Sequence, residues 1–423
     1  MPAVVFTTRG ALNKSALRQA NERLILNAIR QNPSMSRADI VRMTGLSPSS
    51  VTFIVERLKR DKMIYDHEPE NHSRVGRPPT ALRLRADAKM AIGVEITLSG
   101  SNIALADLTG HVVRKTVVPW DANHELFFDR VHRAIYAMVD SLSPKQVLGV
   151  GVGLPGYIDR NTGKVLAAEN LGWFGVEAGR LLRKRLSVPF YYENNAKLSA
   201  LAETWSFKPG SKRLANFVFV TMRGGLGTGV IVNGRILQGA SSGAAEFGHT
   251  VLYPDGRRCP CGNSGCWEQY ASDLALCRAY SQQNGGAGGA HPEPDVIVRM
   301  AREGDAVALR VLKETANHVG LGFVNLVMAL NPEAIVVGDY LAAGWDLVGD
   351  IVWSVLRSRV PSYYLAGVRI FPSEHAADSS LLGAVALVLG QFFTTFDPKR
   401  HHRQAILTEA STLSWATSAA LAR

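Results

Sequence analysis

The chain has 423 residues, of which 46% are hydrophobic and 20% are charged. This length exceeds what one hydrophobic core covers, and the composition excludes extended disorder, so two or three domains are expected. No apolar run reaches the length of about 18 residues that a membrane span needs, and residues 1–20 lack the apolar stretch of a signal peptide. We therefore expect a cytoplasmic protein that has no membrane partner.

The formal net charge of +11 is concentrated at the N-terminal end of the chain. Residues 1–90 contain 16 Lys and Arg against 8 Asp and Glu, which leaves a net charge of +3 for the rest. A basic, compact segment is typical of proteins that bind the phosphate backbone of nucleic acids. A solvated basic surface has the same composition, so charge alone does not decide between the two.

Residues 22–60 carry the pattern of short helices separated by a turn. Residues 22–31 have apolar side chains at the spacing of one helix face. Ser36 and Asp39 form a sequence-level capping box, Gly45 ends the short helix that follows, and Ser47-Pro48 opens another. The last helix places four apolar residues on one face: Val51, Ile54, Val55 and Leu58.

Two helices around a glycine turn, the second longer and basic, predict a helix-turn-helix. The start of its second helix then faces the major groove, where Ser47, Ser49, Ser50 and Thr52 are candidates for contacts to bases or phosphates. Arg57, Lys59 and Arg60 lie further along and are candidates for phosphate contacts. An ordinary three-helix bundle is the alternative, but it leaves the charge unexplained.

The segment after this helix, residues 64–85, reads as two short strands around a polar loop, which is a wing. Within the loop, the run from Arg74 to Pro79 (RVGRPP) resembles the Gly-Arg-Pro core of minor-groove hooks, with Arg74 and Arg77 as the contacting residues. A simple linker fits this short motif nearly as well.

From residue 90 onward strands and helices alternate, which predicts an α/β body long enough for two lobes. The expected elements are a three-strand meander, one helix and five further strands, at 91–98, 101–108, 111–118, 124–141 (the helix), 147–154, 218–222, 227–233, 335–338 and 368–372. Residues 285–290 (GGAGGA) predict a surface loop, and residues 396–423 a terminal extension.

Four potential metal ligands lie within 18 residues: His249, Cys259, Cys261 and Cys266, with the spacing H-x9-C-x-C-x4-C. Three thiolates and an imidazole suit a closed tetrahedral zinc site, and four protein ligands leave no open position for catalysis. We therefore expect a structural Zn²⁺, with free buried cysteines as the alternative. Cys277, in an apolar helical stretch, is expected to be a small core residue.

The run Glu246–His249 (ExGH), followed by Cys259–Glu268 (CxCGxxGCxE), resembles the signature of the ROK family of repressors, open reading frames and sugar kinases. The resemblance covers about residues 90–390 and implies an actin-like, two-lobed fold that binds sugar in the cleft between its lobes. The predicted organisation is a winged helix-turn-helix at 1–88, lobe 1 at 89–205, lobe 2 with the zinc loop at 206–395, and an extension at 396–423.

The resemblance also implies a catalytic base that this chain lacks. Kinases of the family carry an Asp as general base where this sequence has Asn195, whose amide cannot take a proton near neutral pH. The first phosphate loop, at 93–98, lacks paired glycines and contains Glu95 and Ile96, although the second, at 224–229, is better preserved. We therefore expect no enzyme activity.

The family's sugar-binding residues carry over more fully. The resemblance implies that Glu246 and Glu268 accept hydrogen bonds from sugar hydroxyls and that Asn194 and Asn195 bind sugar as well. It implies that His249 ligates zinc through one nitrogen and sugar through the other, with Asn170 and Gly156 lining the cleft. Each carboxylate alone has the alternative role of a surface ion-pair partner.

We therefore expect a sugar-responsive transcriptional regulator, a repressor of carbohydrate genes, that binds a double-stranded operator as a homodimer or homotetramer. Repression relieved by the sugar is the expected logic, and the opposite sign is the alternative. Two other functions remain open: an ATP-dependent sugar kinase that carries a DNA-binding head, and a helix-turn-helix that contacts protein instead of DNA.

Overall fold

A computed structural model describes residues 14–67, 80–184, 186–205, 214–284 and 292–393. These described residues form two compact units, one within residues 86–389 and one within residues 14–85 together with 390–393. Three of the predicted features lie outside the described residues: the wing residues Arg74 and Arg77, the loop 285–290 and the extension 396–423. Within the described residues, no helix is both long enough and apolar enough to cross a membrane.

The described residues of the smaller unit up to residue 85 form three helices and a two-stranded antiparallel sheet: α1 (Lys14–Gln31), α2 (Arg37–Thr44), α3 (Pro48–Arg60), β1 (Ile64–His67) and β2 (Ala81–Leu84). Helix α1 begins eight residues before the predicted 22–31, because residues 14–21 are rich in good helix formers such as Ala, Leu and Arg. The two strands are those expected of a wing.

The predicted helix boundaries at the turn are confirmed. Ser36 and Asp39 form the reciprocal capping box, and Gly45 ends α2 in the left-handed region at φ 69°. The side chain of Ser47 accepts the N–H of Ser50 at the start of α3. Val51, Ile54, Val55 and Leu58 are all buried, so the predicted apolar face of α3 is the face that packs on the core.

The larger unit contains two five-stranded sheets with the same strand order. In the first sheet, order β10-β6-β3-β4-β5, three strands form the predicted antiparallel meander and two join it in parallel: β3 (Met90–Thr97), β4 (Gly100–Asp107), β5 (Val112–Pro119), β6 (Val147–Leu154) and β10 (Phe190–Asn194). The second sheet repeats this order as β15-β14-β11-β12-β13, with β11 (Phe217–Thr221), β12 (Gly227–Val232), β13 (Arg235–Ile236), β14 (Ala334–Val337) and β15 (Arg369–Pro372).

A third, smaller antiparallel sheet follows β6 and has the order β7-β8-β9, from β7 (Tyr157–Asp159), β8 (Lys164–Ala168) and β9 (Trp173–Val176). We call the part of the larger unit that holds the first and third sheets the first lobe, and the part that holds the second sheet the second lobe. The repeated strand order is what makes the unit two-lobed. The predicted division at residues 205 and 206 stays a prediction.

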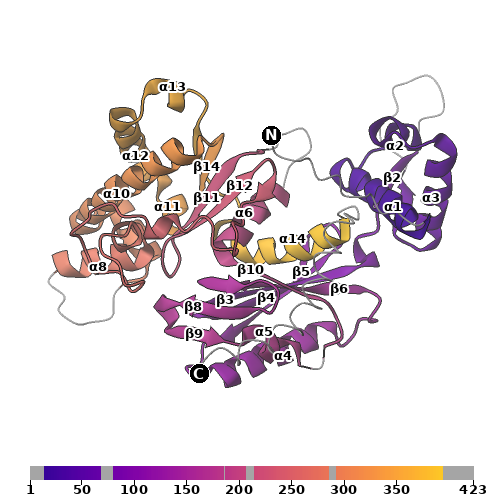
Figure 1. Cartoon of the computed structure of the whole chain (residues 1–423), viewed down its shortest axis with the longest axis horizontal. Coiled ribbons are helices and arrows are strands. Elements are labelled where there is room, and N and C mark those ends of the chain that lie inside the picture. The colour runs from indigo at the N-terminus through magenta and orange to yellow at the C-terminus, as the bar shows by residue number, and fades with distance from the viewer. Residues whose placement is uncertain (1–13, 68–79, 185, 206–213, 285–291, 394–423) are drawn as a thin grey trace, which may run out of the picture. The chain divides into compact units, whose positions relative to one another are not determined.

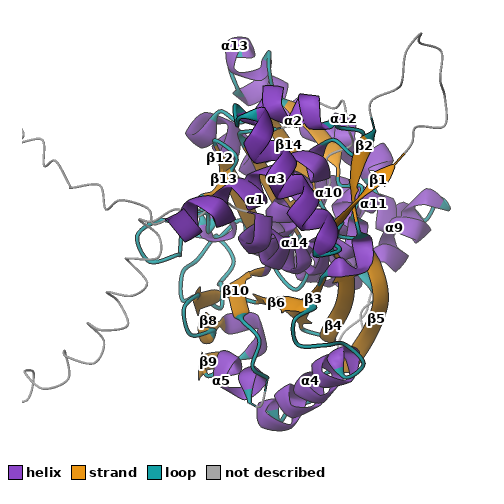
Figure 2. Ribbon diagram, turned by 90° about the vertical axis from the view of Figure 1, so that its right-hand side faces the viewer, coloured by secondary structure: helices purple, strands orange, loops and turns teal. Residues whose placement is uncertain are grey.

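The first sheet is covered on both faces (Figures 1 and 2). Helices α4 (His124–Val139) and α5 (Ala178–Arg183) lie on one face, and α14 (Ser379–Phe393) lies on the other. Glycines allow α14 to approach closely: a Cβ at Gly151 would lie 2.0 Å from the carbonyl oxygen of Ala384. Helix α6 (Asn195–Trp205) meets α14 in the same way, since a Cβ at Gly383 would lie 1.9 Å from the oxygen of Leu198.

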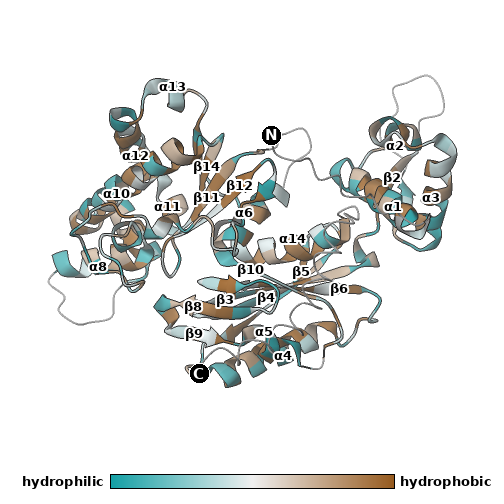
Figure 3. Ribbon diagram, viewed as in Figure 1, coloured by the Kyte–Doolittle hydropathy of each residue, from teal (hydrophilic) through white to brown (hydrophobic). Residues whose placement is uncertain are grey.

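Helix α6 packs on the second sheet at β11 and β12. The remaining helices surround the larger apolar core of this lobe and are α7 (Glu268–Ala271), α8 (Asp273–Gln283), α9 (Pro294–Arg302), α10 (Ala306–Leu330), α11 (Asp339–Ala343), α12 (Trp345–Arg359) and α13 (Ser362–Leu365). Each lobe has its own apolar core. Surface helices are two-sided in hydropathy: α4 carries both brown and teal residues in Figure 3, and its apolar side chains, including Phe127 and Val131, are buried.

Candidate functional site

A cavity of about 430 Å³ lies in the larger unit and is lined by residues of both lobes. All seven residues predicted from the family resemblance to bind sugar line it: Gly156, Asn170, Asn194, Asn195, Glu246, His249 and Glu268. The fold therefore gathers into one place residues that lie more than a hundred positions apart in sequence. Strand ends and helix starts supply most of the lining, which is the usual location of ligand sites in α/β proteins.

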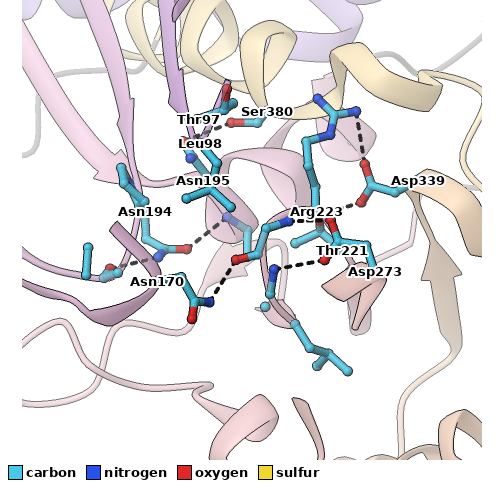
Figure 4. Close-up of a pocket in the computed structure, with 18 of the residues that line it drawn as sticks. Thr97, Leu98, Asn170, Asn194, Asn195, Thr221, Arg223, Asp273, Asp339 and Ser380 are labelled. Atoms are coloured by element: carbon cyan, nitrogen blue, oxygen red, sulfur yellow. Dashed lines mark hydrogen bonds and ion pairs between the residues drawn. The ribbon is translucent and has the colours of Figure 1, made fainter. Parts of the chain in front are cut away.

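Asn194 and Asn195 lie where β10 ends and α6 begins (Figure 4). The side-chain oxygen of Asn194 accepts the backbone N–H groups of Ala196 and Lys197, and its nitrogen donates to the carbonyl of Gly156 at 2.9 Å. Asn195 donates to the carbonyl of Ile96 at 2.8 Å and accepts the hydroxyl of Ser380 at 3.2 Å. Both amides thus hold the fold of the cavity wall.

A buried charged cluster supports this wall from behind. Glu193 is fully buried and pairs with Arg160 at 2.7 Å and with Gln238 at 2.8 Å. Lys197, only 1% exposed, donates to the carbonyl of Ser242, and burial lowers the pKa of its ammonium group. Through this contact α6 holds the loop that leads to Glu246, in which Ser242 adopts a left-handed backbone at φ 65°.

The glycine loop after β11 is held by two carboxylates on its N–H groups. Asp273 accepts the N–H of Gly224 at 2.6 Å and that of Gly225 at 3.2 Å, and Glu268 accepts the N–H of Leu226 at 2.9 Å. Burial raises the pKa of Asp273 to about 6. In nucleotide-binding proteins such N–H groups bind phosphate, so here side-chain carboxylates take the place of that anion.

The opposite face of the same loop is also bonded. Asn170, in the 3-10 turn Glu169–Leu171 of the first lobe, donates to the carbonyl of Gly224 at 2.8 Å (Figure 4). A Cβ at Gly225 would lie 2.6 Å from a Glu268 oxygen, so only glycine fits there. These contacts within the protein account for the glycines of the loop without a bound nucleotide.

Arg223 joins the two lobes beside this loop. Its guanidinium lies 3.0 Å from Asp339 and 3.8 Å from Glu95, and it donates to the carbonyl of Ala377 at 2.8 Å. Glu95 is buried, accepts the amide of Asn102 at 2.9 Å, and has its pKa raised by burial. The guanidinium of Arg223 thus lies between Glu95, in the segment that corresponds to the first phosphate loop, and Asp339 of the second lobe.

Sequence reasoning missed Arg223 and Asp273. Arg223 directly precedes the glycine pair, so its place in the sequence was a usable signal for a residue beside the loop. Asp273 lies 49 residues from its partner Gly224 and has no motif around it that points to this contact. Only the packing of α8 against the loop reveals its role.

The four predicted metal ligands form one cluster. Their ligand atoms all lie within 4.8 Å of one another, with Nδ1 of His249 at 3.7 Å from Sγ of Cys259 and the sulfurs of Cys261 and Cys266 at 3.8 Å. Tetrahedral zinc with Zn–S bonds of about 2.3 Å separates two sulfurs by about 3.8 Å. The donor set and its spacing therefore fit a tetrahedral metal ion.

The fourth cysteine lies apart from the cluster. Cys277 is buried in the core of the second lobe, and its thiol donates to the carbonyl of Pro292 at 3.2 Å, which confirms it as a core residue. His249, in contrast, both belongs to the cluster and lines the cavity. Because its Nδ1 faces Cys259, its Nε2 is the nitrogen available to a ligand in the cavity.

In the helix-turn-helix the predicted DNA-contacting residues fall into two groups. Ser47, Ser49, Thr52 and Arg60 are exposed on the surface of α3, and Ser50 is half-buried. Arg57 instead pairs with Glu22 of α1, and Lys59 pairs with Asp66 of β1. These two cations hold the unit together, which leaves Arg60 as the exposed cation near the end of the helix.

Comparisons with known proteins agree on both parts of the chain. The sequence model of the ROK family matches residues 91–391, and one described as winged helix-turn-helix DNA-binding matches residues 18–65. A xylose repressor of Caldicellulosiruptor bescii is 27% identical over 403 residues, which cover 90% of this chain and 98% of that protein.

Two solved structures share the fold. A ROK family transcriptional regulator, described as a homolog of the E. coli MLC protein, superposes with a TM-score of 0.75 at 22% identity, over 90% of this chain and 98% of that one. A glucokinase from Streptomyces griseus, solved with glucose and AMPPNP, superposes with a TM-score of 0.63 at 28% identity, over 70% of this chain and 98% of that one. The predicted fold, a winged helix-turn-helix followed by an actin-like sugar-kinase-type body, is confirmed.

Proposed function

The chain belongs to the ROK family, and with this as premise we propose that it is a sugar-responsive DNA-binding repressor. The winged helix-turn-helix binds an operator, and a sugar in the cavity of the larger unit changes the affinity for DNA. A xylose repressor similar along nearly its whole length supports this function. The observation that carries the proposal is the coexistence of a polar, carboxylate-lined cavity with an amide where a kinase needs a base.

Sugar binding would use the groups of the cavity that still have hydrogen-bonding capacity. The carboxylate of Glu246 and Oε1 of Glu268 accept hydroxyl protons, and Nε2 of His249 bonds another hydroxyl. Asn194, Asn195, Asn170 and Gly156 shape the wall more than they grip the sugar, since their polar atoms bond to the protein. Within the predicted set, Glu246, Glu268 and His249 are therefore proposed to bind the sugar, and the other four residues to shape the wall.

Zinc would be held by His249, Cys259, Cys261 and Cys266, and it would close the loop 249–266 as a structural ion. The ion fixes the orientation of the His249 ring, because the metal occupies one ring nitrogen and the other then points to the cavity. Sugar occupancy and the shape of this loop are thereby linked through one side chain.

Chemistry on the sugar is not part of the proposed function. Asn195 bonds to Ile96 and Ser380 and carries no proton acceptor for a sugar hydroxyl. The N–H groups of the glycine loop bond to Asp273, and Arg223, beside the loop, pairs with Glu95 and Asp339. An ATP-dependent sugar kinase with a DNA-binding head is the second candidate, which the similarity to a glucokinase favours.

On DNA, two heads of a homodimer, or two of the four in a homotetramer, would bind the half-sites of a pseudo-palindromic operator in the cytoplasm. A sugar can change operator affinity only as far as its own affinity differs between the two conformations. Coupling free energies of about 1–3 kcal/mol are typical, which correspond to roughly 5- to 150-fold changes in operator affinity.

The experiment uses the full chain in two stages. A thermal-shift screen of sugars and sugar phosphates first finds the ligand, because binding raises the unfolding temperature. Duplexes enriched from a random library then report DNA affinity with and without that ligand. Glu246→Gln should weaken ligand binding about tenfold or more, since a charged acceptor is lost, and should abolish the response on DNA. Glu177→Gln, outside the cavity and paired with Lys164, is the matched control.

The same ligand distinguishes the second candidate. Incubation with ATP and Mg²⁺ should yield no phosphorylated sugar from the natural chain or from Asn195→Asp, because a restored base still meets a glycine loop whose N–H groups bond to Asp273. Phosphorylation at enzyme-like rates by the natural chain would favour the kinase.

A further inference from the structure

Phe53 is the most exposed large apolar side chain of the smaller unit's described residues, with 56% of its surface accessible. The aliphatic residues of the same helix, α3, are all buried: Val51, Ile54, Val55 and Leu58. Phe53 is therefore an exposed phenyl ring in a helix whose aliphatic residues are all in the core. A single exposed apolar side chain is common on protein surfaces, so the position of Phe53 on the helix and its neighbours decide whether a partner covers it.

The position of Phe53 on the helix indicates which partner. An α-helix has about 3.6 residues per turn, so residue 53 lies on the same face as residues 49 and 60, four before and seven after it. Ser49 and Arg60 are both exposed, and the core-facing Val51 and Val55 lie on the other side. Phe53 therefore stands at the centre of the outward face of α3, in the half that enters the major groove in a helix-turn-helix.

The polar residues around the start of α3 are partly committed to each other. The hydroxyl of Ser47 accepts the N–H of Ser50 at 3.2 Å and donates to the hydroxyl of Ser50 at 2.8 Å, and Ser49 bonds to Ser47 at 3.1 Å. Ser47 thus caps the helix, and the hydroxyls of Ser49 and Ser50 bond to the hydroxyl of Ser47. More than half of the surface of Phe53 is accessible beside these hydroxyls.

The charge around the ring favours DNA over an apolar protein surface. The guanidinium of Arg18, on α1, lies 5.8 Å from the centre of the Phe53 ring, within the range of a cation–π contact. Arg60 lies on the same face of α3, and residues 1–90 carry twice as many basic as acidic residues, 16 against 8. An apolar ring with cations beside it matches a groove floor that offers a methyl group between two phosphate backbones.

We propose that Phe53 is a specificity-determining residue that reads thymine by packing its ring against the C5-methyl group in the major groove. Thymine is the base that displays a methyl there, and apolar side chains recognise it by contact alone. The inference rests on the proposed function as a DNA-binding protein and adds to it one base preference for each half-site.

The test uses the full chain and a duplex enriched from a random library by the natural protein. Each thymine of that duplex is replaced, one at a time, by deoxyuridine, which removes only the methyl group. Dissociation constants are measured by fluorescence anisotropy for the natural chain, Phe53→Ala and Met43→Ala. Met43 is the matched control, because it is 52% exposed but lies on α2. Thermal melting checks that each variant folds.

For the natural chain we expect one thymine position per half-site at which deoxyuridine weakens binding about three- to tenfold. Phe53→Ala should lose that sensitivity and keep every other, whereas Met43→Ala should keep the whole profile. A deoxyuridine profile that is the same with and without Phe53 overturns the role of this residue and leaves DNA binding intact. Uniform weakening by Phe53→Ala on every duplex overturns it too, because a contact between two heads would act in that way. A natural chain that enriches no duplex overturns the proposed function, and this inference with it.

Discussion

The guanidinium of Arg223 and the carboxylate of Asp339 form an ion pair at 3.0 Å on the floor of the cavity. Asp339 also accepts the hydroxyl of Thr221 and the N–H of Met222, and its own backbone is left-handed at φ 52°. The same guanidinium reaches Glu95 of the first lobe. The pair is therefore the second-lobe half of an ionic link between the lobes.

Arg223→Ala should destabilise the larger unit by about 2–4 kcal/mol, because it leaves two poorly exposed carboxylates without their cation. Urea unfolding followed by circular dichroism measures the change. Arg302→Ala is the matched control: it removes a pair with Asp346 in which both side chains are about half exposed, and it should shift the unfolding midpoint little. Equal midpoints for the two variants would contradict a linking role for Arg223.

Asp273 should give the stability of the protein a distinctive pH dependence. Its pKa rises from 3.8 to about 6 on folding because the carboxyl is buried. The folded state therefore holds the proton more tightly than the unfolded state, and stability from this group is full below pH 3.8 and lost as pH rises through about 6. The loss amounts to about 2–3 kcal/mol.

The measurement compares the free energy of unfolding of the natural chain and Asp273→Asn at several pH values between 4 and 7. Titration of all other groups cancels in the difference between the two proteins. As pH rises from 4 to 7, the free energy of unfolding of Asp273→Asn should increase by about 2–3 kcal/mol relative to that of the natural chain. A difference that is flat over the range would show that burial leaves the Asp273 carboxyl unaffected.

The cysteine cluster predicts a metal content. The purified chain should contain about one zinc ion per chain by mass spectrometry of the metal, and Cys266→Ser should contain almost none and melt at a lower temperature, because structural zinc contributes directly to folding. Cys277→Ser, which removes a buried thiol outside the cluster, should keep its zinc. Equal zinc loss in both variants would indicate general unfolding instead of ligand removal.

The two arginines near the end of α3 should behave differently. Arg60 is exposed, so Arg60→Ala should reduce the slope of log affinity against log salt by about one for each phosphate contact it makes. Arg57 pairs with Glu22, whose side chain is 14% exposed, so Arg57→Ala should chiefly lower the melting temperature of the head. Fluorescence anisotropy at several salt concentrations and thermal melting give the two readouts. A lower salt slope for Arg57→Ala at an unchanged melting temperature would reverse the assignment.

The helix-turn-helix could be predicted nearly to the residue because its signals are local. Ser36, Gly45 and Ser47 act on backbone groups within four positions of themselves, and the apolar face of α3 follows from helical spacing alone. The start of α1 was missed because the helix was recognised only by the apolar spacing within residues 22–31. Eight strands of the larger unit could be predicted too, since turns bound their apolar runs, but β7, β8, β9, β10 and β13 were missed.

For the wall of the cavity, the sequence could predict which residues line it but not which groups they bond to. A family motif names Asn195 and Glu268 as cavity residues, but their partners come from distant segments: Asn195 bonds to a carbonyl 99 residues away, and Glu268 to an N–H 42 residues away. Whether a polar side chain grips a ligand or holds the wall depends on such partners. The sequence pattern contains no information about them.

Trp267 follows directly on the last cysteine of the metal cluster and is fully buried against helix α10. A Cβ at Gly322 would lie 1.9 Å from its ring, and its indole N–H donates to the carbonyl of His318 at 2.9 Å. The indole therefore fixes the cysteine loop to α10, the longest helix of the second lobe, so that a movement of the loop would strain this helix. The chain has seven tryptophans, so a variant that keeps Trp267 alone would report movement of the loop by its own fluorescence, with no added dye.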